Sequence, residues 1–288
     1  MFNFFASLRL CVENTLMYSK DLFKNKVALV TGGRSGIGYG IAKQFLELGA
    51  KVFICSRKEE PLQAAAVALG KIGPCHYHPC DIRKTDQVEA VAEKIKEVYG
   101  QLDILINNAG GQFPSPAEMI SERGWVAVIN NNLNGTFFVT QQMFKSFFQP
   151  QQQGIVVNII ANMYRGFPGM VHTGAARAGV ENLTKTLAQE WAKHGVRINA
   201  IAPGTIESSG LDQYPPHVQA QFEAGRKANL MGRFGTVEDI ANATMFYASP
   251  LSSYVSGTTL YVDGLEHLAN DRMGFLDNLL EGVKNASS

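Results

Sequence analysis

Residues 31–38 read TGGRSGIG and connect an apolar segment to an amphipathic one. Glycine permits a tight turn and lets the backbone approach a ligand closely, and the first N–H groups of a helix attract anions. The turn therefore predicts a phosphate-binding site in the first βαβ unit, which favours a dinucleotide as ligand. Its residues are Gly32, Arg34, Ser35, Gly36, Ile37 and Gly38.

The end of the second expected strand indicates which dinucleotide binds. It reads CSRK (55–58), without the acidic residue that commonly accepts hydrogen bonds from the adenosine ribose of NAD. Arg57, together with Arg34 in the glycine turn, could clamp a 2′-phosphate by charge-assisted hydrogen bonds. The alternative is that both arginines are solvated surface charges. We expect NADP(H) as the cofactor rather than NAD(H).

The elements around these residues alternate between strand and helix patterns. Amphipathic helices separate continuous apolar strands, which is typical of a parallel sheet covered on both faces. The predicted fold is α/β: a single-domain, doubly wound, parallel seven-stranded sheet, the Rossmann fold. The helices are expected at 36–48, 58–69, 85–99, a region ending near 149, and 174–194. The strands are expected at 26–31, 51–55, 75–80, 102–107, 154–160, 196–202 and 258–263.

One domain is expected at residues 25–264, between an N-terminal extension (1–24) and a C-terminal tail (265–288). Residues 204–235 interrupt the alternation with several glycines and prolines. They predict a helical substrate lid over the carboxyl ends of the strands, where ligands bind in such sheets. A protein start at Met17 is an alternative, so it is open whether residues 1–16 belong to the natural protein.

Composition excludes several partners and compartments. The net charge is +1, with 26 basic and 25 acidic residues and no basic patch, so we expect no nucleic-acid partner. No apolar stretch approaches the roughly 20 residues of a membrane span. Four cysteines are too sparse for a disulfide framework in 288 residues, and the N-terminus is only a weak signal-peptide candidate. We therefore expect a cytoplasmic protein.

The segment CHYHPC (75–80) invites a metal-site interpretation, which we do not favour. Successive residues of a strand point to opposite faces, so one tetrahedral ion could not gather both cysteines and both histidines. We expect a structural strand there and no metal site.

Four more motifs follow the glycine turn in order: CDI (80–82), NNAG (107–110), NNLNG (131–135) and PG (203–204). Together they resemble the short-chain dehydrogenase/reductase family over roughly residues 25–264. The resemblance implies a homo-oligomer, dimer or tetramer, and an active-site asparagine at Asn132. It also implies that Asp81 and Ile82 flank the adenine, that Asn108, Ala109 and Gly110 line the riboses, and that Pro203, Gly204 and Ile206 border the nicotinamide.

The chain departs from the family at three catalytic positions. Ile160, Thr173 and Arg177 stand where the family usually has serine, tyrosine and lysine. Arg177 can hydrogen-bond ribose hydroxyls, but a guanidinium stays protonated, so it cannot relay a proton. Thr173 can donate a hydrogen bond, but its hydroxyl is too weak an acid to protonate an alkoxide. The pattern therefore disfavours carbonyl reduction.

Reduction of a C=C bond conjugated to a thioester makes a lighter demand on the proton donor than carbonyl reduction does. Hydride goes to the β-carbon, and the enolate oxygen needs hydrogen bonds rather than full protonation. The stretches at 107–121 and 171–185 are similar to 2-enoyl-CoA reductases of the peroxisomal trans-2-enoyl-CoA and 2,4-dienoyl-CoA types. Glu181 stands where the trans-2-enoyl-CoA reductase has a tyrosine often assigned as catalytic, and it could pair with Arg177. Tyr164 is the candidate proton donor; the alternative is a tyrosine that only packs on the lid.

Three hypotheses follow, all compatible with the predicted cofactor site. The leading one is an NADPH-dependent reductase of a 2-enoyl-CoA or a related acyl thioester, with Asn132, Tyr164, Thr173 and Arg177 as catalytic residues. The second is an NADP-dependent alcohol or carbonyl oxidoreductase, acting for example on a 3-oxoacyl or terpenoid substrate. The third is a non-catalytic NADP-binding regulator.

Overall fold

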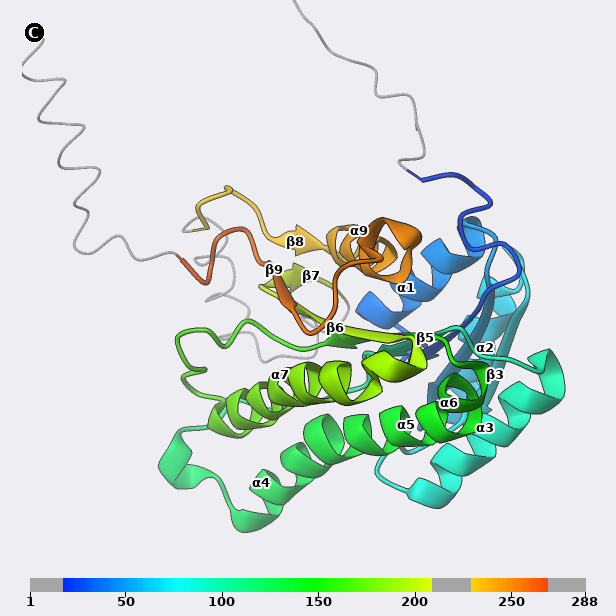
Figure 1. The fold of residues 1–288 in the computed structure, drawn as a ribbon. Helices are drawn as coiled ribbons and strands as arrows, with labels where there is room; N and C mark the ends of the chain where they lie inside the picture. The colour runs from blue at the N-terminus through cyan, green and yellow to red at the C-terminus, as the bar shows by residue number, and fades with distance from the viewer. Residues whose placement is uncertain (1–17, 209–228, 269–288) are drawn as a thin grey trace, which may run out of the picture.

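The structure of the protein is a computed structural model, which describes residues 18–208 and 229–268. A parallel seven-stranded sheet forms the centre of these residues (Figure 1). The strands lie in the order β3-β2-β1-β4-β5-β6-β9, and each neighbouring pair is parallel. The predicted doubly wound sheet is confirmed. The strands are β1 (Val27–Thr31), β2 (Lys51–Ser56), β3 (Cys75–Pro79), β4 (Ile104–Asn107), β5 (Gly154–Ile159), β6 (Val196–Pro203) and β9 (Thr259–Val262).

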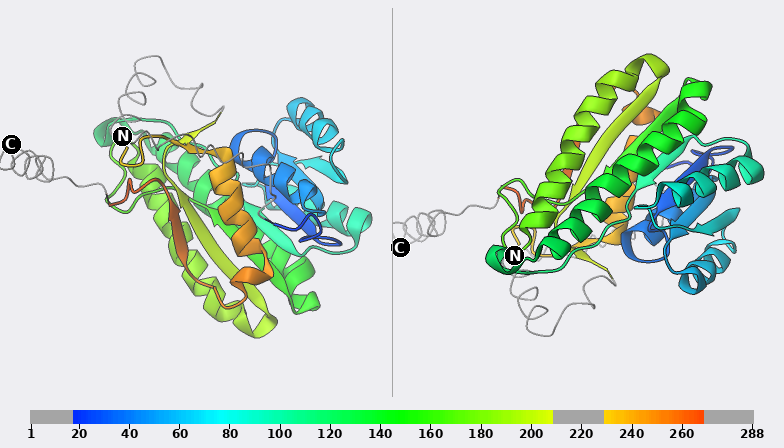
Figure 2. Two further views of the ribbon diagram at one scale, coloured as in Figure 1. Left: turned by 90° about the horizontal axis from the view of Figure 1, so that it is seen from above. Right: turned by 90° about the horizontal axis from the view of Figure 1, so that it is seen from below.

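Helices cover both faces of the sheet, as the two views of Figure 2 show. The core on one face contains side chains from α1, α2 and α9, and the core on the other face contains side chains from α3, α5 and α7. The helices are α1 (Gly36–Glu47), α2 (Glu59–Leu69), α3 (Thr85–Tyr99), α4 (Glu122–Ile129), α5 (Gly135–Met143), α6 (Gln149–Gln151), α7 (Val171–Trp191) and α9 (Val237–Ala248). None of the helices in the described ranges is long and apolar enough to cross a lipid bilayer.

Strand β1 shows how the sequence builds two cores from one sheet. Val27 and Leu29 belong to the core under α3, α5 and α7, whereas Ala28 and Val30 belong to the core under α1, α2 and α9. All four side chains are fully buried. The alternation follows from the pleat, which points successive side chains to opposite faces. A strand buried on both sides is therefore mainly apolar, as residues 27–30 are.

The long helical region after β4 is less regular than predicted. Two π-helical turns, Asn130–Asn134 and Phe144–Phe148, separate α4, α5 and α6. The five phenylalanines of this region divide: Phe144, Phe147 and Phe148 are buried, and Phe137 and Phe138 are half-buried. The first π turn carries Asn132 and turns its amide toward the loop after β4, where it bonds to Gly111.

The predicted domain edges at residues 24 and 264 do not coincide with the packing. Phe23 is buried and packs edge-to-face on Phe45 of α1, with 4.9 Å between ring centroids. Residues 18–24 therefore pack on the domain. Residues 265–268, assigned to the tail, are also hydrogen-bonded to it. The remaining parts of the predicted extension and tail, 1–17 and 269–288, lie outside the described residues.

The predicted lid, 204–235, is described only at its two ends. Ile206–Glu207 (β7) pairs in parallel with Gly235–Thr236 (β8), so these ends form a two-stranded sheet rather than the helix expected there. Residues 209–228 lie outside the described residues.

The CHYHPC segment forms strand β3, as predicted. It pairs with β2 over Cys75–Pro79, and His76 Nδ1 lies 2.9 Å from the hydroxyl of Tyr99. In the part of the chain that the structure describes, no group of three His, Cys, Asp or Glu side chains could hold a metal ion.

Candidate active site

The turn between β1 and α1 has the geometry expected of a phosphate-binding turn. Gly32 and Gly36 have φ values of 69° and 56°, which glycine adopts most readily. A Cβ at Gly38 would lie 2.5 Å from the carbonyl oxygen of Gly32, so only glycine allows this approach. Ser35, the N-cap of α1, makes no side-chain capping hydrogen bond. The first N–H groups of α1 are therefore not capped by that side chain and fit a pyrophosphate.

The NNAG motif is hydrogen-bonded to the end of β1. The backbone N–H groups of Asn108 and Ala109 both donate to Thr31 Oγ1 at 3.0 Å. Asn108 Nδ2 donates to the carbonyl oxygen of Thr31, also at 3.0 Å. These bonds hold residues 108–110 beside the glycine turn, at the carboxyl ends of β1 and β4. Ligands bind at this edge of doubly wound sheets.

A buried chain of hydrogen-bonded polar side chains links the strands and helices that carry the site. Asn107 Nδ2 donates to Thr140 Oγ1 at 2.7 Å and to Asn158 Oδ1 at 2.8 Å. Asn158 Nδ2 in turn donates to Thr184 Oγ1 at 2.9 Å. The chain ties α5 and α7 to strands β4 and β5. Sequence reasoning missed it, although the two asparagines within apolar strands are a readable signal.

The predicted adenosine end carries an arginine that sequence reasoning missed. Arg83 Nε donates to Asp81 at 2.8 Å, and the two side chains form an ion pair. Chiefly this hydrogen bond, and to a smaller extent the charge of Arg57, lower the pKa of Asp81. Arg57 is exposed at the end of β2. Ile82 is buried, and a Cβ at Gly135 would lie 2.7 Å from its Cγ1.

Three predicted site residues from different parts of the chain meet at the centre: Gly110, Asn132 and Arg177. A Cβ at Gly110 would collide with Arg177 Nη2 and lie 2.7 Å from Asn132 Oδ1. Asn132 is held firmly, because its Nδ2 donates to the carbonyl oxygens of Gly111 at 2.7 Å and Val128 at 2.9 Å. Only glycine at position 110 leaves room for this arrangement.

Arg177 is a buried cation, with 8% of its surface exposed. Burial lowers its pKa to about 10. Within residues 18–208 and 229–268, no side chain or carbonyl forms an ion pair or hydrogen bond with its guanidinium. A buried charge without a partner is costly. The site therefore fits a ligand that offers hydroxyl or anionic oxygens, such as a cofactor ribose.

Helix α7 begins at Val171, about three residues earlier than predicted, so His172 and Thr173 lie in its first turn. Both side chains are fully buried. The Thr173 backbone N–H donates to His172 Nδ1 at 2.8 Å, and Thr173 Oγ1 lies 3.3 Å from the same nitrogen. The Phe113 ring packs edge-to-face on His172, 4.6 Å between centroids. The structure thus places the Thr173 hydroxyl against the His172 ring. Ile160, at the position where the family usually has serine, is buried as well.

The other two candidate residues lie apart from this centre. Tyr164 is 64% exposed, and its ring packs edge-to-face on Tyr261 and His267, each 5.9 Å away. The predicted pairing of Glu181 with Arg177 is wrong: Glu181 Oε1 accepts from Lys185 Nζ at 2.9 Å. The pairing of Glu181 with Lys185 follows from the burial of α7 side chains, since Arg177 is buried and Glu181 and Lys185 reach solvent.

The PG motif lies at the end of β6, next to the segment after β9. The Gly204 N–H donates to the Val262 carbonyl at 3.1 Å, and a Cβ at Gly204 would lie 2.7 Å from Asp263 Cα. Ile206 is buried in β7. Pro203 ends β6 at the same edge of the sheet as the glycine turn. The structure therefore brings the residues predicted to contact the nicotinamide and those predicted to bind the phosphates to one edge of the sheet.

The family assignment rests on this fold together with a match of residues 32–264 to a family model described as enoyl-(acyl carrier protein) reductase. The chain belongs to the short-chain dehydrogenase/reductase family. It is an oxidoreductase with a small-molecule substrate, and its fold is one that binds a nicotinamide cofactor. This finding favours an enzyme over the non-catalytic alternative.

Several relatives are similar over most of their length. A probable 2,4-dienoyl-CoA reductase of Bacillus subtilis is 37% identical, over 84% of this chain and 96% of its own. A peroxisomal 2,4-dienoyl-CoA reductase of Pongo abelii is 35% identical over 91% of both chains. A 3-oxoacyl-[acyl-carrier-protein] reductase of Thermotoga maritima is 36% identical, over 84% of this chain and 97% of its own.

A solved structure shares the fold closely. The citronellol catabolism dehydrogenase of Pseudomonas aeruginosa superposes with a TM-score of 0.78 at 37% identity, over 87% of this chain and 98% of its own.

Proposed function

We propose that this chain is an NADPH-dependent reductase of the C=C bond of a 2-enoyl-CoA or a related conjugated thioester. The observation that carries the proposal lies in the first two turns of α7. They hold Thr173 and a buried, unpaired guanidinium, Arg177, and the helix contains no tyrosine. Two dienoyl-CoA reductases among the similar proteins support the substrate class.

The residues suit the stabilisation of an enolate. NADPH supplies the hydride when bound. The Arg177 guanidinium would hold ribose hydroxyls and add positive charge where the thioester oxygen becomes negative, and a fixed positive charge in a dry site stabilises that oxygen strongly. The Thr173 hydroxyl would donate a hydrogen bond once substrate displaces its contact with His172. Asn132 would keep the loop after β4 next to Arg177 in place, through its hydrogen bonds to the Gly111 and Val128 carbonyls.

The proposal includes NADP(H) as the cofactor. Arg34 lies in the glycine turn, and Arg57 follows β2 with an exposed side chain. The carboxylate of Asp81, whose pKa the charge of Arg57 helps to lower, is already paired with Arg83. A 2′-phosphate would therefore meet net positive charge at this end of the site.

The proton for the α-carbon would come from Tyr164 or from water. Tyr164 is exposed and lies in the loop after β5, at the carboxyl edge of the sheet. Because Tyr164 is exposed and Thr173 and Arg177 are buried, its role is a separate hypothesis from theirs. Tyr164→Phe should lower kcat if the hydroxyl gives the proton, and an unchanged kcat would assign Tyr164 to packing alone.

A second candidate function is reduction of a 3-oxoacyl thioester or another carbonyl. It is favoured by the 36% identity to a 3-oxoacyl reductase. In that case a group other than Thr173 must protonate the alkoxide, and Tyr164 is the candidate.

One assay separates the candidates. The purified protein is mixed with NADPH and, in turn, crotonyl-CoA, a longer 2-enoyl-CoA, a 2,4-dienoyl-CoA, acetoacetyl-CoA and a simple aldehyde, and loss of absorbance at the reduced cofactor band is followed. Turnover of only the unsaturated thioesters supports the proposal, whereas turnover of only acetoacetyl-CoA or the aldehyde overturns it. Thr173→Val, which removes the hydroxyl and keeps the shape, should lower kcat more than cofactor affinity.

The proposal extends to the environment of the enzyme. Cys55, Cys75 and Cys80 are unpaired thiols, as expected in a reducing compartment such as the cytoplasm.

We infer a homodimer or homotetramer, and the exposed Trp125 and Val126 on α4 offer apolar contact surface. Light scattering coupled to size-exclusion chromatography measures the subunit number directly.

A further inference from the structure

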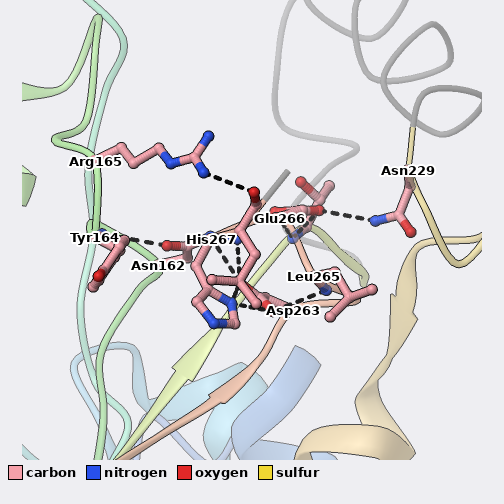
Figure 3. A network of polar contacts seen from close by, with 10 residues as sticks. Asn162, Tyr164, Arg165, Asn229, Asp263, Leu265, Glu266 and His267 are labelled. Atoms are coloured by element: carbon pink, nitrogen blue, oxygen red, sulfur yellow. Dashed lines mark hydrogen bonds and ion pairs between the residues drawn. The ribbon is translucent and has the colours of Figure 1, made fainter. Parts of the chain in front are cut away.

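The six residues after β9, Asp263–Leu268, lie across the end of β6 and are held by several polar contacts (Figure 3). Asn162 Nδ2 donates to Asp263 at 2.9 Å, and Arg165 Nη2 donates to the Leu268 carbonyl at 2.7 Å. The His267 N–H and its Nδ1 both lie 2.8 Å from Asp263 Oδ2. The segment is therefore fixed to the loop after β5.

Glu266 within this segment faces the PG motif. Both of its carboxylate oxygens accept the Thr205 backbone N–H, each at 3.1 Å. Asn229 Nδ2 donates to Oε1 at 3.4 Å. A Cβ at Gly204 would lie 2.7 Å from Glu266 Oε2. The carboxylate therefore occupies the space directly beside Gly204 and Thr205.

The charge of Glu266 has no cationic partner among the residues that the structure describes. The neighbouring acidic group, Asp263, differs, because it forms an ion pair with His267 when the imidazole is protonated. Glu266 is held only by neutral N–H donors. Its side chain is partly buried, and solvent screens such a charge less than one on the open surface.

We propose that Glu266 is a positioning residue of the nicotinamide pocket, which orders the Pro203–Ile206 wall through Thr205 and makes the pocket prefer the oxidised over the reduced cofactor. This inference rests on the proposed function in one respect, that the nicotinamide lies against Pro203–Ile206. No role for Glu266 follows from the motifs of the sequence, since it lies beyond the last strand.

The preference follows from the charge of the ring. The oxidised nicotinamide carries a positive charge, and the reduced ring is neutral. The Glu266 carboxylate, which lies beside Gly204, would attract only the oxidised form electrostatically. It also favours the transition state of hydride donation, in which that positive charge develops on the ring.

The test compares dissociation constants for NADP⁺ and NADPH in the wild-type protein and in Glu266→Gln, by calorimetric or fluorescence titration. Glutamine keeps an oxygen for the Thr205 N–H and removes the charge. The ratio of the NADP⁺ to the NADPH constant should rise about three- to tenfold, as expected for one charge several ångströms away in a partly screened site. A merely structural role would weaken both nucleotides equally and leave the ratio unchanged.

The ratio remains informative if the variant folds poorly, because the folded fraction scales both constants alike. Glu266→Ala provides a second route, and its ratio should rise at least as far as that of Glu266→Gln. Glu93→Gln, on the exposed side of α3, is the matched control and should leave the ratio unchanged. An unchanged ratio in both Glu266 variants overturns the inference while cofactor binding stands. Failure of the wild-type protein to bind either nucleotide overturns the proposed function as well.

Discussion

Replacing Arg177 by methionine should stabilise the cofactor-free protein and weaken its cofactor complex. Methionine fills a similar volume without charge. Burial lowers the pKa of Arg177 from its ordinary value to about 10, because the charged form loses its hydration. At 1.36 kcal/mol per pKa unit, that fall corresponds to a cost of about 3 kcal/mol for keeping the guanidinium charged in the folded protein. Removing the charge removes this cost.

The pH dependence of this cost has a definite sign. The folded-state pKa is lower than the unfolded-state value, so the unfolded chain binds more protons between about pH 10 and the ordinary pKa of arginine. Stability therefore rises with pH only in that window, and the full penalty is present at every pH below about 10. The gain in Arg177→Met should accordingly be the same at pH 6 and at pH 9.

The assay is thermal unfolding of both proteins without cofactor, followed by NADPH titration. A gain of up to about 3 kcal/mol corresponds to a rise in Tm of about 5–10 °C for a domain of this size. Loss of charge-assisted hydrogen bonds to the cofactor, at about 1.5–3 kcal/mol, should raise the Kd for NADPH about ten- to hundredfold.

The control is Arg123→Met, at an exposed position on α4, which should change neither quantity by more than the experimental error. The reasoning is refuted if cofactor-free Arg177→Met unfolds at or below the wild-type temperature. That result would mean that the guanidinium is already satisfied in the folded protein.

Three more predictions test other parts of the site and the fold. Arg57→Asp should raise the Kd for NADPH at least tenfold more than that for NADH, measured by titration; equal effects would remove the phosphate-clamp interpretation. Gly110→Ala should abolish tight cofactor binding and lower stability by about 1–3 kcal/mol, measured by denaturant unfolding, because its Cβ would collide with Arg177 Nη2. The Asp239 carboxylate has its pKa lowered to about 2, first by its hydrogen bond from Arg233 and then by the N-terminal cap of α9. Asp239→Asn should therefore cost about 1 kcal/mol at pH 7, and the difference should shrink as the pH falls from 4 toward 2; a difference independent of pH would contradict the assignment.

The strands and the glycine turn were predictable because their causes are local. The buried parallel strands are mainly apolar, as Val27–Val30 of β1 and Ile155–Val157 of β5 show. Gly32 and Gly36 need positive φ values that few other residues tolerate, so the turn can be read from residue types alone. The order of the motifs then places Asn108 and Gly110 at the same sheet edge, as the structure does.

Helix boundaries were harder, because their signals are weak in this chain. Helix α7 starts after Met170, which offers no capping side chain, so no residue type marked the start. The π turn around Asn132 has no local signal either. Its geometry depends on the Gly111 carbonyl, which belongs to a loop some twenty residues earlier.

Residue types and spacing alone thus determined the sheet, the cofactor turn and the replacement of the usual tyrosine and lysine by Thr173 and Arg177. Tertiary structure decided which charges remain unpaired. Along one helix, Glu181 lies four residues from both Arg177 and Lys185, and the spacing is equally good for either ion pair. Packing buries Arg177 and leaves Lys185 exposed, so Glu181 pairs with the lysine. The cost of burying a charge depends on its distance from water, and that distance exists only once the chain has folded.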